Sequence, residues 1–276
     1  MARSLSRDDR AGHAPLAKTA LRYSARGDYR AAEKTLRAAL RLTANAIPGR
    51  DRLVLWNELG MVSKYLGKFD TAERYYRLAL RHADGCFSSP EREFFLANLY
   101  HNLGGLEHSR RHFLRGEKYT RKALELRLQV APPDSLAVAS DRAALAAILD
   151  GLHRFVEAER HYQHALITYR REYGASHPET AVILNNLGAL YQATGRQKCA
   201  ELHYRAALRI KRKELGASHP DVAVTMNNLA LFYSSQNRTN AARAWLNKAL
   251  HILNESLGNL HPTARAVRKN YQRLCR

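Results

Sequence analysis

The sequence is poor in cysteine, methionine and tryptophan, and it contains no long hydrophobic run. Its 276 residues include three cysteines, Cys86, Cys199 and Cys275, whose odd number and wide spacing argue against a disulfide framework and favour a reducing compartment. No stretch reaches about 18 consecutive apolar residues, so we expect no membrane span. The N-terminal segment MARSLSRDDRAGHAPLA has no continuous apolar core, so we expect no signal peptide. Together these absences predict a cytoplasmic protein.

Acidic residues are scarce as well. The chain has 25 aspartates and glutamates against 45 lysines and arginines, which gives a formal net charge of +20. This balance favours acidic partners and non-specific adhesion to polyanions, but it carries no information about the fold.

Signals of catalysis and of metal binding are also missing. The sequence has no Gly-rich phosphate loop and no nucleophile elbow. The histidine pairs His108–His112 and His161–His164 are four and three residues apart, so each pair could share a helix face, but neither pair has a third ligand nearby. We therefore expect no enzyme, no catalytic residue, no metal site and no cofactor.

The strict alternation of apolar and polar residues that marks a half-buried strand is absent. Residues 1–13 are polar and aperiodic, which predicts a disordered tail. From Pro15 onward, apolar residues recur at helical spacing almost without interruption. The chain is therefore predicted to be all-α.

One sequence segment repeats along the chain. The stretch Gly174–Tyr191, GASHPETAVILNNLGALY, returns as Gly216–Tyr233, GASHPDVAVTMNNLALFY. The His-Pro pair recurs at His177, His219 and His261, which are 42 residues apart each time. A fixed period in the range of about 20–50 residues is typical of a stacked repeat protein. These histidines therefore belong to the linker architecture.

Each repeat is predicted to contain a first and a second helix. Small residues such as Gly188 would let the two helices approach closely, while tyrosines fill the space beside them. Ser176 with Glu179, and Ser218 with Asp221, have the spacing of capping boxes at the start of the first helix. Proline follows each of these serines by two residues and is favoured in a first helical turn.

Two stretches share one pattern of large and small residues, namely Leu184-x-x-Leu187-Gly188-x-x-Tyr191 with Ala200-x-x-x-Tyr204, and Trp56-x-x-Leu59-Gly60 with Ala72-x-x-x-Tyr76. This pattern resembles the tetratricopeptide repeat. The 42-residue period, the Gly-x-x-His-Pro linker and the Leu-Asn-Asn-Leu core are similar to the kinesin-light-chain-like subclass, which is widespread in bacterial proteins. The resemblance implies a solenoid, a right-handed superhelix of antiparallel helix pairs.

The pattern divides the chain into a tail over 1–13, six repeats over 14–262 and a polar capping helix over 263–276. The repeats are expected at 14–46, 53–88, 94–130, 136–173, 178–215 and 220–257. The linkers 81–90 and 131–135 depart from the consensus, but the helical pattern resumes on both sides, so no domain boundary is expected at either.

The resemblance also implies a binding groove lined by the first helices. The side chains expected to face it are Asn57, Lys64, Asn98, His101, Asn102, Asn185, Asn186, Gln192, Asn227, Asn228, Lys269 and Asn270. Asparagine is a mediocre helix former, so its recurrence needs a reason. A carboxamide can pair with the N–H and C=O of a peptide main chain, and in tetratricopeptide domains asparagine at this position holds ligand backbone. Alternatively, these asparagines bond between neighbouring first helices and only tune their stacking.

Basic residues crowd one second helix, at Arg205, Arg209 and Lys211–Lys213, and one turn, at Arg110, Arg111 and Arg115. Such runs are either solvated faces or an electrostatic footprint for nucleic acid or acidic protein. The predicted function is a non-enzymatic scaffold that binds a peptide segment or helix of a partner protein in the groove, and the net charge of the chain favours an acidic partner. The alternative is a basic-surface regulatory protein associated with nucleic acid. No membrane partner is expected.

Overall fold

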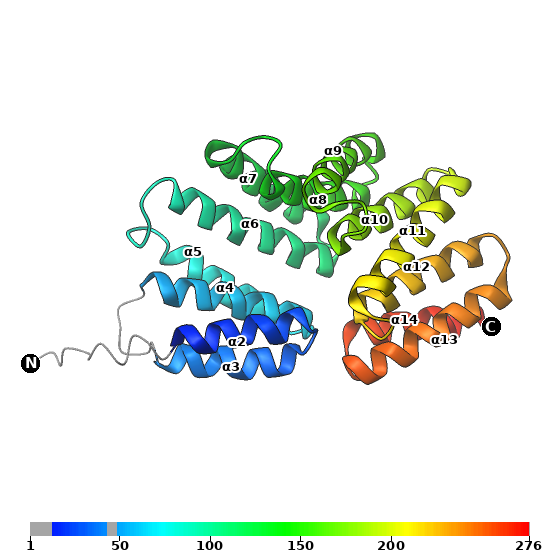
Figure 1. Cartoon of the computed structure of the whole chain (residues 1–276), viewed down its shortest axis with the longest axis horizontal. Coiled ribbons are helices and arrows are strands. Elements are labelled where there is room, and N and C mark those ends of the chain that lie inside the picture. The colour runs from blue at the N-terminus through cyan, green and yellow to red at the C-terminus, as the bar shows by residue number, and fades with distance from the viewer. Residues whose placement is uncertain (1–12, 43–48, 276) are drawn as a thin grey trace, which may run out of the picture. The chain divides into compact units, whose positions relative to one another are not determined.

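The computed structural model describes residues 13–42 and 49–275, and within these ranges the chain forms helices and no strand (Figure 1). The predicted all-α repeat architecture is confirmed. The tail predicted over 1–13 lies outside the described residues except for His13, where the first described helix begins.

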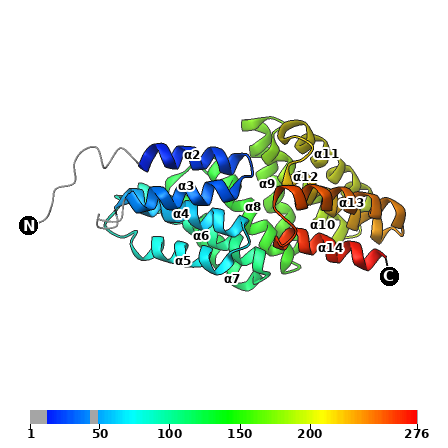
Figure 2. The same ribbon diagram turned by 90° about the horizontal axis from the view of Figure 1, so that it is seen from below.

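The chain divides into two compact units, residues 1–130 and residues 131–276. The first unit is built of helical hairpins, in which consecutive helices are joined by a short turn and packed against each other (Figures 1 and 2). Its helices are α2 (His13–Ala25) with α3 (Tyr29–Leu42), α4 (Arg50–Tyr65) with α5 (Phe69–Arg81), and α6 (Glu91–Arg110) with α7 (Phe113–Val130).

The second unit continues the same arrangement and ends with a helix that has no partner after it in the described chain. Its helices are α8 (Leu136–Gly151) with α9 (Phe155–Tyr173), α10 (Pro178–Ala193) with α11 (Gln197–Leu215), α12 (Pro220–Ser235) with α13 (Thr239–Ser256), and finally α14 (Pro262–Leu274).

The division into units falls at the linker Ala131-Pro132-Pro133, where the sequence predicted no boundary. The predicted bounds of the repeats, and the absence of a domain boundary, stay predictions. Two consecutive prolines have no backbone N–H and cannot continue a helix, so the linker forms none of the helical hydrogen bonds that the flanking segments form.

Small residues allow close approach of the two helices in a hairpin, as the sequence predicted. A Cβ atom added to Gly188 of α10 would lie 2.9 Å from a ring carbon of Tyr204 in α11. Gly60 of α4 faces Tyr76 of α5 in the same way, at 2.4 Å. The rings occupy the space that a larger residue would need, so glycine sets the spacing of these hairpins.

Each turn inside a hairpin uses one residue with positive φ. The residues are Gly27, Gly67, Arg111, His153, Gly195 and Asn237. From Arg111 to Asn237 these residues are 42 positions apart each time, so the positive-φ turn recurs with the same period as the sequence repeat. Arginine and histidine adopt this left-handed conformation at some cost, which the repeated turn geometry imposes on them.

The helices α10, α12 and α14 are capped by histidine. The Nδ1 atoms of His177, His219 and His261 accept hydrogen bonds from the N–H groups two residues later, at 3.2, 3.1 and 3.2 Å. The predicted serine capping boxes are therefore wrong. Proline occupies the first helical position after each histidine, which makes the histidine itself the N-cap residue. The assignment of these histidines to linker architecture is confirmed.

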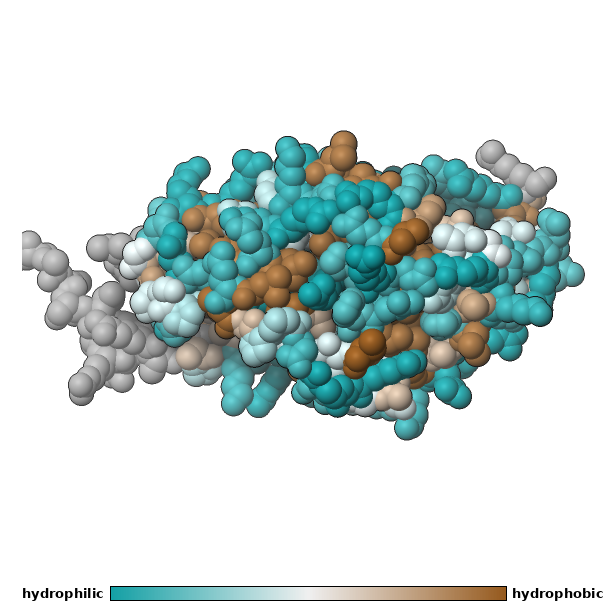
Figure 3. Space-filling model, turned by 90° about the horizontal axis from the view of Figure 1, so that it is seen from above, coloured by the Kyte–Doolittle hydropathy of each residue, from teal (hydrophilic) through white to brown (hydrophobic). Residues whose placement is uncertain are grey.

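Hydrophilic side chains cover most of the face drawn in Figure 3, with separate apolar patches between them. Among the described residues, no helix is both long enough and apolar enough to cross a membrane.

Candidate functional site

The predicted groove residues lie on the first helix of their repeats. Those of the first unit come from α4 and α6, and those of the second unit come from α10, α12 and α14. Helix α4 contacts α6, and α12 contacts both α10 and α14. Within each unit, the predicted residues of consecutive repeats are thus brought next to one another.

Asparagine side chains bond from one repeat to the next in a fixed register. In the first unit, Asn102 Nδ2 donates to Asn57 Oδ1 at 2.8 Å. In the second unit, the equivalent bond joins Asn228 Nδ2 to Asn185 Oδ1 at 3.2 Å. The next repeat forms the same bond, from Asn270 Nδ2 to Asn227 Oδ1 at 2.9 Å. We call this set of inter-repeat amide bonds the asparagine ladder.

Neighbouring asparagines on one helix connect the rungs of the ladder. Asn185 Nδ2 donates to Asn186 Oδ1 at 3.4 Å, and Asn227 Nδ2 donates to Asn228 Oδ1 at 3.3 Å. The Asn186 side chain in turn forms a hydrogen bond with the hydroxyl of Tyr162 on α9, whose pKa is raised by burial. A continuous series of amides therefore runs from α14 through α12 to α10.

The sequence left open whether these asparagines bind a ligand or stabilise stacking, and the structure shows the stacking bonds. Asn185 is 6% exposed, so its amide is largely withdrawn from solvent. Asn102, Asn186, Asn228 and Asn270 are half-buried. A carboxamide offers two N–H donors and an acceptor oxygen, so one ladder bond does not exhaust it. The ligand role of these four residues stays a prediction.

Two other predicted residues also form contacts within the protein. Asn98 Oδ1 accepts a hydrogen bond from Arg127 at 2.6 Å. Gln192 Oε1 accepts from the Tyr204 hydroxyl at 3.0 Å, and Gln192 Nε2 donates to Ser235 Oγ at 3.4 Å. These bonds tie first helices to second helices or to the next repeat, and neither residue belongs to the ladder.

A basic pair lies on the α4–α6 face of the first unit. Desolvation by the surrounding protein lowers the pKa of the Lys64 ammonium group. Desolvation also lowers the pKa of His108, and the nearby charge of Lys64 lowers it further. A carboxylate placed beside this pair would favour the protonated, positively charged forms of Lys64 and His108. The other predicted residues of this kind are His101, which is half-buried, and Lys269, which is exposed.

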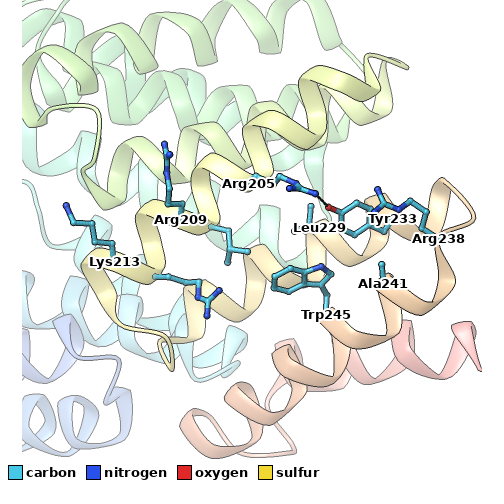
Figure 4. Close-up of a pocket in the computed structure, with 10 residues that line it drawn as sticks. Arg205, Arg209, Lys213, Leu229, Tyr233, Arg238, Ala241 and Trp245 are labelled. Carbon is cyan, nitrogen blue, oxygen red and sulfur yellow. Dashed lines mark hydrogen bonds between the residues drawn. The ribbon is translucent and has the colours of Figure 1, made fainter.

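Sequence reasoning missed that the basic residues of α11 share a surface with Arg238, which precedes α13, and with Trp245 of α13. Arg209, Arg212 and Lys213 line an open depression together with Arg238 and Trp245 (Figure 4). The basic run was visible in the sequence, but nothing there indicated that a tryptophan more than 30 residues later shares its surface. They come together only because α11 and α13 both pack against α12.

The described residues contain no group of three or more histidine, cysteine, aspartate or glutamate side chains placed to hold a metal ion. The predicted groove residues are amides and basic groups, and they suit recognition of polar main-chain and acidic groups.

Comparison with known proteins agrees with the repeat pattern. One tetratricopeptide-repeat model matches residues 143–213 and 200–255, and a second matches residues 53–81, so together they cover just over half of the chain. No curated protein sequence matches.

Solved structures share the fold at low sequence identity. NprR in complex with its cognate peptide NprX has a TM-score of 0.73 at 15% identity, over 98% of this chain and 75% of NprR. Rap protein complexed with Competence and Sporulation Factor has a TM-score of 0.64 at 12% identity, over 95% and 76% of the two chains. BtubC (BKLC) from P. vanneervenii has a TM-score of 0.58 at 23% identity, over 91% and 94%. The chain belongs to the tetratricopeptide-repeat family.

Proposed function

We propose that this chain is a non-enzymatic interaction module that binds a peptide segment or a helix of a partner protein on the first-helix face of its repeats. The observation that supports this best is the register of half-buried carboxamides at Asn186, Asn228 and Asn270. Carboxamides neither transfer protons nor attack substrates at neutral pH, whereas they pair readily with a peptide main chain.

The ladder bonds support this proposal because they fix the carboxamides while leaving part of each one available. Asn102 and Asn270 each donate one N–H to the preceding repeat. Their second N–H and their carbonyl oxygens form no recorded hydrogen bond within the described part of the chain. A side chain already held in place loses less rotamer freedom on binding, so a preorganised amide binds more tightly than a mobile one.

Charge on the same face favours an acidic partner. The lowered pKa of Lys64 reflects a desolvated position, where a partner carboxylate would be attracted more strongly than in open water. In the second unit, Lys269 and Arg273 of α14 are exposed next to the terminal rung. Among proteins of this fold, NprR has been crystallised with a peptide, so the fold is compatible with a peptide ligand.

Mutation of a face residue outside the ladder tests the proposal without disturbing the stacking. Leu231 on α12 is 38% exposed and lies one helical turn from Asn228. A partner recovered by cross-linking pull-down from nuclease-treated lysate would be purified and titrated by calorimetry. Leu231→Glu should weaken its binding at least about tenfold, because a carboxylate would be placed against the bound segment.

Ile167→Glu is the matched control, because Ile167 is an exposed apolar residue of the same unit that lies on the second helix α9. It should leave the affinity unchanged, and circular dichroism should show both variants folded. Equal effects of the two variants, or an effect of Ile167→Glu alone, would contradict binding on the first-helix face.

A further inference from the structure

We infer that the depression between α11 and α13 is a second docking site, which takes an acidic partner segment that carries an apolar side chain. The depression has a volume of about 770 Å³ and belongs entirely to the second unit (Figure 4). Volumes of about 300–1,000 Å³ are typical of pockets that hold a small ligand or a few side chains. The site is separate from the asparagine ladder, so the inference goes beyond the proposed function.

The lining has a basic rim and an apolar floor. Figure 4 shows Arg205, Arg209 and Lys213 extending from α11, with Trp245 of α13 across from them. The complete lining is Arg205, Leu208, Arg209, Arg212, Lys213, Leu229, Tyr233, Arg238, Ala241 and Trp245. Such a surface offers charge pairing at its edge and apolar burial at its centre.

Part of the positive charge is not neutralised within the protein. Arg205 is paired with Glu201 at 2.7 Å, and Lys213 lies 3.4 Å from Glu214. Arg209 and Arg212 are exposed and form no ion pair with any described residue. These two guanidinium groups, one helical turn apart, repel each other unless an anion lies between them.

The other second helices of this unit show that the fold does not require these charges. Positions equivalent to Arg205 and Arg209, 42 residues earlier, are Gln163 and Ile167 in α9. The equivalent positions 42 residues later are Asn247 and His251 in α13. Those helices pack in the same hairpin arrangement without arginine at these two positions, although α9 carries Arg170 at the position of Arg212. Arg205 and Arg209 are therefore a local feature of α11, and a ligand accounts for them better than packing does.

A peptide fits the depression better than a nucleic acid strand. Proteins that bind single strands present several aromatic rings on which successive bases stack. Here the guanidinium group of Arg238 lies over the Tyr233 ring at 4.3 Å, and the ammonium group of Lys248 lies over the Trp245 ring at 5.3 Å, so each aromatic ring of the lining already has a cation on one face. The rest of the floor is aliphatic, and arginine pairs with carboxylates in a bidentate geometry. In a peptide where glutamates flank a leucine or phenylalanine, the glutamates would pair with the basic rim and the apolar side chain would contact the floor.

The tryptophan at the site gives a direct signal of occupancy. The chain has two tryptophans, and Trp56 is buried in the first unit. In a Trp56→Phe background, Trp245 alone reports binding of a short peptide in which glutamates flank a pair of leucines. We expect its emission to change on titration, and we expect the matched glutamine peptide to bind at least about tenfold more weakly. If Trp56→Phe misfolds, anisotropy of a fluorescein-labelled peptide with the native chain measures the same affinity.

Paired charge reversals decide whether the depression is the binding site. Arg209→Glu with Arg212→Glu should lower the affinity at least about tenfold. Arg243→Glu with Arg265→Glu changes the net charge equally at exposed positions that do not line the depression, and it should change the affinity less than about twofold. Equal losses in both double variants would overturn the inference, since general attraction to the +20 chain would then explain binding.

Two further outcomes separate the alternatives. A single-stranded oligonucleotide whose binding depends on Arg209 and Arg212, together with no binding of the glutamate peptide, would overturn the choice of a peptide. Leu231→Glu, which tests the first-helix face, should leave the glutamate peptide's affinity unchanged. Failure of either proposal is therefore distinguishable from failure of the other.

Discussion

Two basic clusters, one in each unit, look alike in the sequence and differ in their surroundings. The first lies at the α6–α7 turn and contains Arg110, Arg111 and Arg115. The second lies on α11 and contains Arg205, Arg209 and Arg212. In the first cluster, carboxylates from a neighbouring hairpin approach the arginines, whereas in the second the carboxylates come only from α11 itself.

The first cluster is an ion-pair network that connects two repeats. Arg110 of α6 bonds to Asp70 at 2.6 Å and to Glu73, both on α5. Arg115 lies 3.5 Å from Glu73 and 3.4 Å from Glu107, whose side chain is completely buried. Arg110 and Arg115 therefore connect elements of the fold. Net positive charge on a helix does not by itself identify a binding surface.

The difference teaches that acidic neighbours decide the role of a basic cluster. Arginines that satisfy buried carboxylates should matter for folding, and arginines without such partners should matter for binding. Three experiments test this division, in order of decreasing expected effect on stability.

Removal of Arg110 should give the largest loss. Arg110→Met removes the ion pairs with Asp70 and Glu73 and leaves the buried carboxylate of Glu107 with Arg115 as its remaining arginine neighbour, so it should lower the free energy of unfolding by about 2 kcal/mol. The measurement is the urea midpoint followed by circular dichroism. Arg212→Met on α11 is the control and should change the free energy by less than about 0.5 kcal/mol. Similar losses of stability in both variants would contradict the distinction between the cluster at the α6–α7 turn and the cluster on α11.

Acid should weaken the first cluster selectively. Hydrogen bonding from Arg110 holds the pKa of Glu73 below its usual value of 4.5, and Arg77 adds to this effect. Because the folded state binds the proton less readily, the stabilisation is present above pH 4.5 and is lost as the pH falls through the lowered pKa. In urea unfolding at pH values from about 6 to about 3, Glu73→Gln should therefore lose less stability than the native chain.

The matched control for this acid series is Glu214→Gln on α11, where the carboxylate is exposed. It should keep the native dependence on pH. A Glu73→Gln variant with the full native loss in acid would show that the α5–α6 ion pairs do not account for it.

Exchange of residues between repeats should have the smallest effect on stability. Arg205→Gln with Arg209→Ile gives α11 the residues that α9 carries at the equivalent positions. The free energy of unfolding should stay within about 0.5 kcal/mol of the native value, because α9 packs without these charges. A larger loss, measured by urea unfolding, would show that Arg205 and Arg209 stabilise the fold, as Arg110 is expected to do.

Much of the fold could be predicted because it depends on local pattern. The 42-residue spacing of His177, His219 and His261 is the spacing at which α10, α12 and α14 begin. The close contact of Gly188 with Tyr204 also follows from small and large residues at fixed positions. The capping residue was not predicted, because serine capping statistics were applied without the constraint that proline at the first helical position imposes.

The candidate site could be predicted in part. Its residues were identified as members of one helix face, but their hydrogen-bond partners were not, since a rung such as Asn228 to Asn185 joins residues of different repeats. The same applies to the pairing of Arg110 with Glu73 and to the meeting of Arg209 with Trp245.

By itself, the sequence determined the helices, their pairing into hairpins and the period of the repeat, because periodicity, small residues and turn residues act over neighbouring positions. Only the tertiary structure decided which polar groups are already used within the protein. Whether an asparagine or arginine can bind a partner depends on groups about 40 residues away, as in the bonds from Asn102 to Asn57 and from Arg110 to Asp70. Packing sets those distances, and residue type does not.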